Sequence, residues 1–338
     1  MNDVFALLAA SAADQASIFA PASPPAESIR DLSTLVIAIA LVIFLVVEGV
    51  LCYCIVHFRR RRSEQIAVEP AQVYGSKPIE VAWTVAPALI VFTLVLVTTR
   101  TLWEVEVTPP KPVPNDDTLF VTVVGRQWWW EYQYQHYNGQ PIGFVTANEL
   151  HVPASDASTP RRVFLTLKSA DVCHSFWVPR LAGKTDLIPG RENSMWFQTD
   201  EPGLFVGQCA EYCGTQHGNM LLRVFVDEPA VFERWLDEQK RPAVSEAMVD
   251  SGRKAFAAQS CVNCHRIRGT AAVGTYGPDL THLMSRTTLA SGMIENNAEN
   301  LSRWIADPQK IKQGCLMPAF GLSDRDRDLI VEYLLTLR

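Results

Sequence analysis

Four side chains that bind soft metals fall within twelve residues of the sequence: Cys209, Cys213, His217 and Met220. Thiolates, thioethers and imidazoles are soft to borderline ligands, so this set suits copper better than a hard cation. Glycines within the run predict a loop wrapped round a metal rather than a helix. A zinc site and a Cys209–Cys213 disulfide are the alternatives. Zinc has little use for a thioether, and a disulfide would leave the histidine and the methionine unexplained.

A second imidazole comes from His174, about 35 residues upstream in the apolar run Cys173-His-Ser-Phe-Trp-Val-Pro179. A single histidine in such a run is more often a buried core residue. The loop downstream makes a metal ligand the better interpretation. Cys173, beside this histidine, is expected to be a bystander thiol.

The segment Cys261-Val-Asn-Cys264-His265 has the c-type haem attachment pattern. Both thiols would bond to the haem vinyl groups, and His265 would ligate the iron. A chance match and half of a zinc ribbon are the alternatives. No second CxxC pair follows in the sequence to complete a zinc site.

The haem iron needs a sixth ligand, and Met317 in the loop before the last expected helix supplies it. Met284 and Met293 are the alternatives, each expected to lie in the core or in a loop. A His/Met pair raises the reduction potential of haem iron. Cys315 is expected to be a packed thiol.

The elements that position these residues begin with two long apolar segments, residues 34–57 and 81–103. About 24 residues at ~1.5 Å each span the ~30 Å hydrocarbon core of a bilayer. The run Arg59-Arg-Arg-Arg62 predicts a cytoplasmic loop over 59–79, with both outer ends outside. Residues 1–20 contain no Lys or Arg, which favours an uncleaved extracytoplasmic tail over a cleaved signal peptide.

One acidic residue lies within the first apolar segment, and another directly precedes the second. An ionisable group at the depth of Glu48 is costly, so this residue either has a function or faces a partner subunit in its protonated form. Glu80 opens the second segment, where a first-turn acid favours the helix dipole.

Short alternating stretches separated by Gly and Pro predict the strands of a small β-sandwich or Greek-key barrel. They cover residues 119–125, 128–134, 162–167, 194–198 and 221–226. Residues 108–117 predict a linker, 228–244 a short amphipathic helix, and 246–259 and 326–337 the first and last helices of the haem module. We therefore expect a multidomain chain: an N-terminal tail (1–33), a transmembrane helix hairpin (34–103), an all-β domain (104–244) and an all-α domain (245–338).

The formal net charge of −6 argues against nucleic acid as a partner. Residues 104–244 contain 18 acidic and 12 basic side chains and so account for the whole negative balance. An acidic face would steer a basic redox partner, or the excess would only keep the surface solvated.

The sequence resembles the cytochrome c oxidase subunit II family in four blocks: Gly125–Tyr132, Asp171–Pro179, Lys184–Arg191 and Gly207–Gly214. The resemblance implies a cupredoxin-like fold that holds a dinuclear mixed-valence copper centre, CuA, whose two cysteines bridge both coppers. The implied ligands are Cys209, Cys213, His174, His217, Met220 and the backbone carbonyl of Glu211. Sharing one electron between two metals leaves little to reorganise when the charge changes, which suits electron transfer.

The resemblance also implies roles for residues outside the ligand set. Trp128 would be the exposed point at which electrons enter, and Glu80 would lie at the cytoplasmic mouth of the proton path called the K channel. The Glu211 carboxylate would reach a magnesium ion shared with subunit I. Asp186 and Arg191 would lie at that interface, or would simply be a turn pair.

The C-terminal module resembles class I cytochrome c domains, including the turn Gly277-Pro-Asp-Leu280 near the haem edge. A subunit II with such a domain is the caa-type arrangement. It implies a protein of the bacterial inner membrane that passes electrons from haem c to CuA and on to subunit I, where oxygen is reduced and protons are translocated.

The implied partners are subunit I and further membrane subunits, a cytochrome c or upstream respiratory complex as electron donor, and a copper chaperone with a reductant. The CuA subunit of a nitric oxide reductase is an alternative. A membrane-anchored copper-handling protein is another, but it does not explain the haem motif.

Overall fold

The computed structural model describes residues 16–59, 72, 74–106, 110, 117–156, 158–243 and 249–338. The predicted cytoplasmic arginines 60–62, most of the linker and the boundary at 244/245 lie outside the described residues. The chain forms two compact units, Ser28–Glu106 and Met1–Glu27 with Val107–Arg338.

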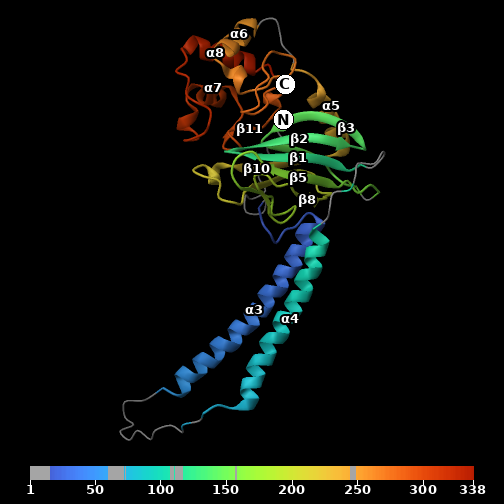
Figure 1. The fold of residues 1–338 in the computed structure, drawn as a ribbon, viewed down its shortest axis with the longest axis vertical. Coiled ribbons are helices and arrows are strands. Elements are labelled where there is room, and N and C mark those ends of the chain that lie inside the picture. Colours follow the sequence, from blue (N-terminus) through green and yellow to red (C-terminus); the bar gives the residue numbers. More distant parts are fainter. Residues whose placement is uncertain are drawn as a thin grey trace. The chain divides into compact units, whose positions relative to one another are not determined.

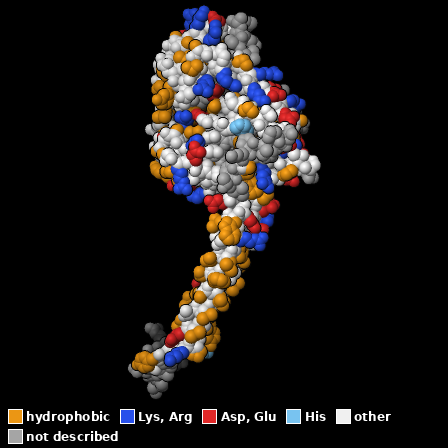
Figure 2. Space-filling view, turned by 45° about the vertical axis from the view of Figure 1, so that its right-hand side comes forward, with side chains coloured by type: hydrophobic (Ala, Val, Ile, Leu, Met, Phe, Trp, Pro, Cys, Tyr) orange, Lys and Arg blue, Asp and Glu red, His pale blue; other side chains and the backbone are white. Residues whose placement is uncertain are grey.

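The first unit is a helical hairpin of α3 (Pro24–His57) and α4 (Lys77–Val105) (Figure 1). Both helices are long and apolar enough to cross a membrane, and none of the side chains in their most apolar stretches is buried in the described structure. Hydrophobic side chains cover much of the hairpin surface (Figure 2). The two apolar segments are therefore confirmed as helices that cannot bury their side chains within this chain.

The helix α3 begins earlier than expected, because residues 24–33 of the predicted tail are helical. Pro24 and Pro25 fit the first turn of a helix, where no backbone N–H bond is needed. Glu27 in the same turn favours the helix dipole. Hydropathy marked only the apolar part of this helix, since its polar first turns carry no apolar signal.

The second unit contains a β-sandwich of two five-stranded sheets (Figure 1). Their strand orders are β3-β2-β1-β5-β8 and β4-β10-β9-β6-β7. The strands are β1 (Leu119–Arg126), β2 (Trp129–Tyr137), β3 (Gln140–Ala147), β4 (Glu149–Pro153), β5 (Val163–Ser169), β6 (His174–Trp177), β7 (Thr185–Leu187), β8 (Asn193–Phe197), β9 (Gly203–Cys209) and β10 (Leu221–Asp227). All five predicted strands are present, and β3, β4, β6, β7 and β9 were missed.

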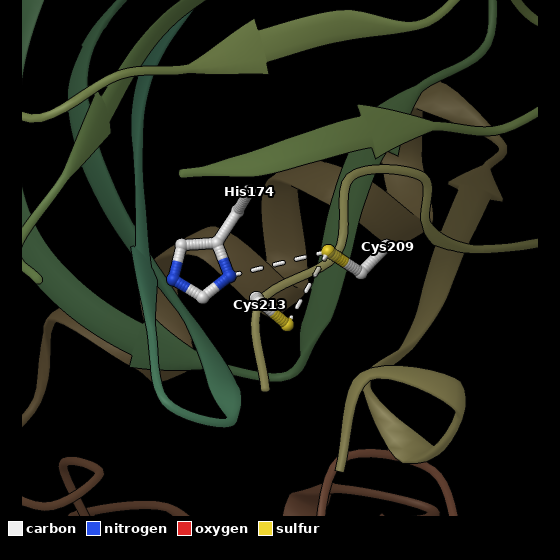
Figure 3. A group of neighbouring side chains, drawn as sticks. All are labelled: His174, Cys209 and Cys213. Atoms are coloured by element: carbon white, nitrogen blue, oxygen red, sulfur yellow. Dashed lines mark hydrogen bonds between the residues drawn. The ribbon is translucent and has the colours of Figure 1, made fainter. Parts of the chain in front are cut away.

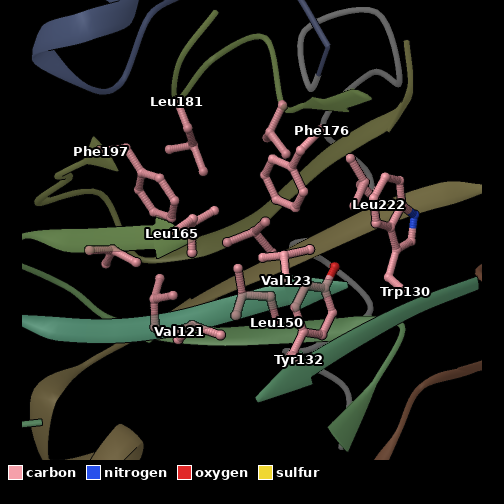
Figure 4. Close-up of a cluster of buried hydrophobic side chains, with 14 of the residues drawn as sticks. Val121, Val123, Trp130, Tyr132, Leu150, Leu165, Phe176, Leu181, Phe197 and Leu222 are labelled. Carbon is pink, nitrogen blue, oxygen red and sulfur yellow. The ribbon is translucent and has the colours of Figure 1, made fainter. Parts of the chain in front are cut away.

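The interior of the sandwich is filled by buried hydrophobic residues from strands of both sheets (Figure 4). In β2, Trp130, Tyr132 and Tyr134 are fully buried, as the period-two pattern of aromatics predicts. The Trp130 ring lies 6.1 Å from the His174 ring and 5.8 Å from the Phe176 ring. The core therefore extends up to the predicted copper ligand and fixes the position of its ring.

The helix α5 (Pro229–Lys240) follows the last strand and packs on the sandwich through Phe232 and Leu236. It corresponds to the predicted amphipathic helix, although it ends before the predicted 244. The rings of Phe232 and Tyr137 meet edge to face at 5.2 Å.

The C-terminal part is helical and has its own hydrophobic core. Its helices are α6 (Asp250–Ala258), α7 (Ala298–Ala306) and α8 (Asp324–Leu334). The first and last helices pack together, with the rings of Phe256 and Tyr333 5.9 Å apart. The expected all-α domain is confirmed, and it also contains a short hairpin of β11 (Thr288–Leu289) and β12 (Ile294–Glu295).

Candidate metal centre and haem site

The predicted copper ligands come from two neighbouring strands, β6 and β9, and from the loop that follows β9. His174 opens β6, Cys209 ends β9, and the loop 210–220 returns the chain to β10 through a short 3-10 turn at His217–Asn219. The Cys209 N–H donates to the Met220 carbonyl at 2.9 Å, which closes the loop. The Ala210 N–H donates to the Ser175 carbonyl at 3.0 Å and ties the loop to β6.

The sulfur atoms of Cys209 and Cys213 lie 3.8 Å apart (Figure 3). His174 Nδ1 is 3.9 Å from the Cys209 sulfur, and His217 Nδ1 is 3.7 Å from the Cys213 sulfur. Both sulfurs are buried. Because metal–thiolate bonds are ~2.3 Å long, two sulfurs at this separation can share metal ions between them.

The two remaining predicted donors complete the cluster. The Met220 sulfur lies 3.9 Å from the Cys213 sulfur, and the Glu211 carbonyl oxygen lies 3.3 Å from the Cys209 sulfur. All six predicted ligands are therefore brought together. A set of two thiolates, two imidazoles and a thioether, of which only His217 is partly exposed, fits copper by softness.

Asp171 orients the His174 ring. Its Oδ1 lies 2.8 Å from His174 Nε2, so the other ring nitrogen faces the thiols. Such a carboxylate partner fixes the tautomer and orientation of a metal-ligating histidine. Burial lowers the pKa of His174, but the interactions with Asp171 and Cys209 together outweigh it and leave the pKa raised. Asp171 was part of a matching block but was not predicted as a site residue.

The two thiols differ in acidity in the metal-free protein. Hydrogen bonding from Cys213 and His174 lowers the pKa of Cys209, although burial opposes it. The neighbouring Cys209 thiolate raises the pKa of Cys213, and burial adds to this. Cys209 is therefore readily deprotonated, whereas a second thiolate, at Cys213, requires a nearby cation to stabilise it.

Trp128 lies between the copper loop and the C-terminal domain. Its indole N–H donates to the Cys213 carbonyl at 2.9 Å, and the Gln127 amide donates to the same oxygen at 2.8 Å. A Cβ on Gly314 would lie 3.9 Å from Cη2 and Cζ3 of the indole, which is van der Waals contact. The prediction that Trp128 is exposed is wrong, because the segment around Gly314 covers it and leaves it half-buried.

The haem motif lies on a 3-10 turn at Cys261–Asn263 that follows α6. Cys261 is half-buried and Cys264 exposed. His265 Nδ1 lies 2.8 Å from the Pro278 carbonyl, which leaves Nε2 as the nitrogen for an axial bond. The ring also packs on the backbone of Gly277, where a Cβ would come within 2.6 Å of it.

Met317 is half-buried in a loop whose carbonyls are held by Gln309. The Gln309 amide donates to the carbonyls of Met317 at 2.8 Å and Cys315 at 2.9 Å. The Cys315 thiol lies in the same loop, and burial raises its pKa. Met284 packs against the core of the helical domain, as expected of a structural methionine.

The remaining predicted residues are not among the donors of the copper cluster. Asp186 is on β7, with its carbonyl bound by the Asn193 side chain at 2.7 Å, and Arg191 is in an exposed turn. Glu80 lies in the first turn of α4. Glu48 is on α3. Cys173 is exposed, as expected of a bystander.

Lys312 is a residue that the sequence analysis did not single out. It is buried between the two domains of this unit and donates to backbone carbonyls of both. Its partners are backbone carbonyls of residues far away in the sequence, so no motif or regular spacing marks this lysine. Only the folded structure reveals its role.

The fold and the two sites define a class: an electron-transfer protein with a copper domain and a cytochrome c domain on a helical membrane anchor. Family models agree, matching "Cytochrome C oxidase subunit II, periplasmic domain" at residues 119–226, its "transmembrane domain" at 12–100 and "Cytochrome c" at 249–338. The chain belongs to the cytochrome c oxidase subunit 2 family. It is the subunit through which electrons enter the oxidase, and its partner there is subunit I.

Two curated relatives are similar over almost their whole length. The chain is 34% identical over 323 residues to cytochrome c oxidase subunit 2 of Alkalihalophilus pseudofirmus, covering 94% of this chain and 90% of that protein. It is 33% identical over 340 residues to the Bacillus subtilis subunit, covering 95% and 92%. A solved structure, the periplasmic domain of subunit II (CoxB) of Bradyrhizobium japonicum, is 32% identical and covers 38% of this chain and 96% of that chain, with a TM-score of 0.32.

Proposed function

We propose that electrons reach the cytochrome c domain first and cross to a dinuclear copper centre through Trp128, before passing to subunit I. The observation that carries this proposal is the position of the Trp128 indole. It donates to the carbonyl of a copper-loop cysteine at one end, and at the other it lies beside Gly314, where an added Cβ would be 3.9 Å from the ring, three residues from Met317. A conjugated ring between two redox sites shortens the gap that an electron must cross.

The donor set supports a two-metal site. One copper ion is served by four ligands, whereas six donors lie together here, the two cysteine sulfurs among them. The CuA pair, when bound, supplies a one-electron couple with little reorganisation. The chain's own contribution is to hold the imidazoles and sulfurs rigidly, through Asp171 on one side and the Cys209–Met220 backbone bond on the other.

Covalent haem c would be held by Cys261 and Cys264, with His265 and Met317 as axial ligands. The Pro278 carbonyl fixes the imidazole, and Gln309 fixes the methionine loop. Haem c, when bound, supplies the second one-electron couple. The relatives are named as oxidases, which favours an oxygen-reducing partner over a nitric oxide reductase.

Further roles complete the proposal. The Glu211 carboxylate would bind a magnesium ion shared with subunit I, with Asp186 and Arg191 at that contact. Glu80 would admit protons from the cytoplasmic side. The membrane would be the bacterial inner membrane, with the N-terminus and both C-terminal domains outside. A cytochrome c or an upstream complex would donate electrons, and a chaperone would deliver copper.

The test is metal and haem analysis with EPR spectroscopy on the purified full-length chain. We expect two coppers and one covalent haem per chain, with a mixed-valence copper signal that Cys209→Ser abolishes. Cys173→Ser is the matched control, since it removes a neighbouring exposed thiol and should leave the signal unchanged. Zinc or a single mononuclear copper would contradict the copper assignment and favour a metal-handling role.

A further inference from the structure

Lys312 is a buried lysine whose partners are three backbone carbonyls. Its side chain is 2% exposed. The ammonium nitrogen lies 2.8 Å from the Trp128 oxygen, 2.8 Å from the Asn219 oxygen and 2.9 Å from the Ala290 oxygen. An ammonium group has three N–H donors and no acceptor, so this arrangement satisfies it completely. In the described part of the chain it forms no ion pair with a carboxylate.

The three carbonyls belong to both domains. Trp128 and Asn219 are in the copper domain, and Asn219 directly precedes the ligand Met220. Ala290 lies in the turn between β11 and β12 of the cytochrome c domain. Lys312 itself belongs to the loop that leads to Met317. One side chain therefore joins the copper loop, the tryptophan and the haem-ligand loop.

Burying an ammonium group without a counter-ion is unfavourable, and burial here lowers the pKa of Lys312 to about 7. A lysine that served only the helical domain would find its acceptors there. Two of the three acceptors lie instead across the domain boundary. The cost of burial is therefore offset only when the domains are in contact.

Other polar contacts run along the same boundary. The Gln216 amide donates to the Gln313 carbonyl at 2.7 Å. The buried Glu149 carboxylate accepts from the backbone N–H groups of Thr287 and Thr288 at 2.9 Å each, and from both of their hydroxyls at 2.7 Å. Together with Lys312 these contacts hold the boundary at two separate places.

We propose that Lys312 is a positioning residue that locks the cytochrome c domain onto the copper domain with Trp128 held between them. This inference rests on the proposed transfer through Trp128. A merely tethered domain would search for its contact at an effective concentration of roughly millimolar order. A locked domain transfers electrons at one fixed geometry and one first-order rate.

The test compares Lys312→Met, which keeps the length but removes every donor, with Lys310→Met in the intact oxidase. Lys310 is 83% exposed and forms only an ion pair with Asp307 at 3.7 Å, which makes it the matched control. Two quantities are measured: the rate of electron transfer from haem to copper after photoreduction, and the haem–copper distance distribution by pulsed EPR.

We expect Lys312→Met to slow transfer about tenfold or more, because small misplacements of reacting groups have large effects, and to broaden the distance distribution. Lys312→Arg, which keeps the charge and several donors, should fall between this variant and wild type. Lys310→Met should match wild type in both measurements.

An unchanged rate and distance distribution in fully loaded Lys312→Met would overturn the proposal. Loss of copper or haem in Lys312→Met but not in Lys310→Met would also overturn it, because the residue would then serve folding instead of positioning. Trp128→Phe separates the two proposals. An unchanged rate in that variant would reject the tryptophan route, while a broadened distance in Lys312→Met would still support the lock.

Discussion

The indole nitrogen of Trp128 lies 2.9 Å from the carbonyl oxygen of Cys213, although 85 residues separate them in the sequence. This hydrogen bond lies within the copper domain and ties the start of the second strand to a cysteine of the copper loop. Two glycines also lie close to the ring, since a Cβ at Gly214 would lie 2.9 Å from its Cζ2 and one at Gly314 would lie 3.9 Å from its Cη2.

Trp128→Phe should slow haem-to-copper transfer by about tenfold or more, because it removes the hydrogen bond and shortens the ring system. The copper EPR signal and the haem absorbance should stay unchanged, since Trp128 supplies no ligand. Transient absorption after photoreduction measures the rate. Trp129→Phe, in the neighbouring strand position, is the control and should transfer at the wild-type rate.

Asp171→Asn should weaken copper binding by roughly 10–100-fold, because partners that orient a ligating histidine typically have effects of this size. The asparagine can still reach His174 Nε2 but cannot hold it by charge. Competition with a copper chelator measures the affinity. Affinity equal to wild type would show that the β6 backbone alone orients the ring.

The same pair predicts a pH dependence in the copper-free protein. Burial raises the pKa of Asp171, but hydrogen bonds from His174 and backbone N–H groups outweigh it and lower the pKa overall. The pKa of His174 is raised. The pair therefore stabilises the fold most at pH values between the ordinary pKa values of the two side chains, about 3.8 for aspartate and about 6.5 for histidine. This stabilisation is lost as the pH falls through the lowered pKa of Asp171 or rises through the raised pKa of His174.

Thermal melting of the copper-depleted chain across this range should show a maximum that Asp171→Asn flattens. A variant with the wild-type pH profile would mean that other groups dominate the titration.

Oxidation should block copper loading. The sulfurs of Cys209 and Cys213 are 3.8 Å apart, and one is readily a thiolate, the nucleophile in disulfide formation. We expect the metal-free protein in air to form this disulfide and to take up copper only after reduction. Thiol alkylation with mass spectrometry measures the oxidised fraction. Full copper uptake by the air-oxidised protein would refute this expectation.

Gly252→Ala should destabilise the cytochrome c domain. A Cβ there would lie 2.1 Å from the Leu329 carbonyl oxygen and 2.8 Å from Tyr333 Cβ, so α6 and α8 would have to separate. Overpacking typically costs about 1–3 kcal/mol, which exceeds the ~0.5–1 kcal/mol gained from helix propensity. Denaturant unfolding followed by haem absorbance measures the loss. Lys254→Ala on the exposed face of α6 should change stability little.

The sequence by itself determined the chemistry of both sites. Ligands such as Cys209, Cys213 and His217 lie on one short loop, so their spacing alone restricts which metal they can bind. The pattern Cys261–His265 is equally local, and the two apolar helices follow from length and composition. Strands rich in alternating apolar residues were predicted for the same reason.

The tertiary structure decided what no local pattern encodes. The strands β4, β6 and β9 are short or carry polar and ligand residues, and their pairing with β10 and with each other makes them strands. Trp128 is covered, and Lys312 is buried, because segments up to 184 residues apart meet across the domain boundary. Contacts of this kind depend on how whole domains dock, and the energy of docking is spread over many residues that have no common spacing.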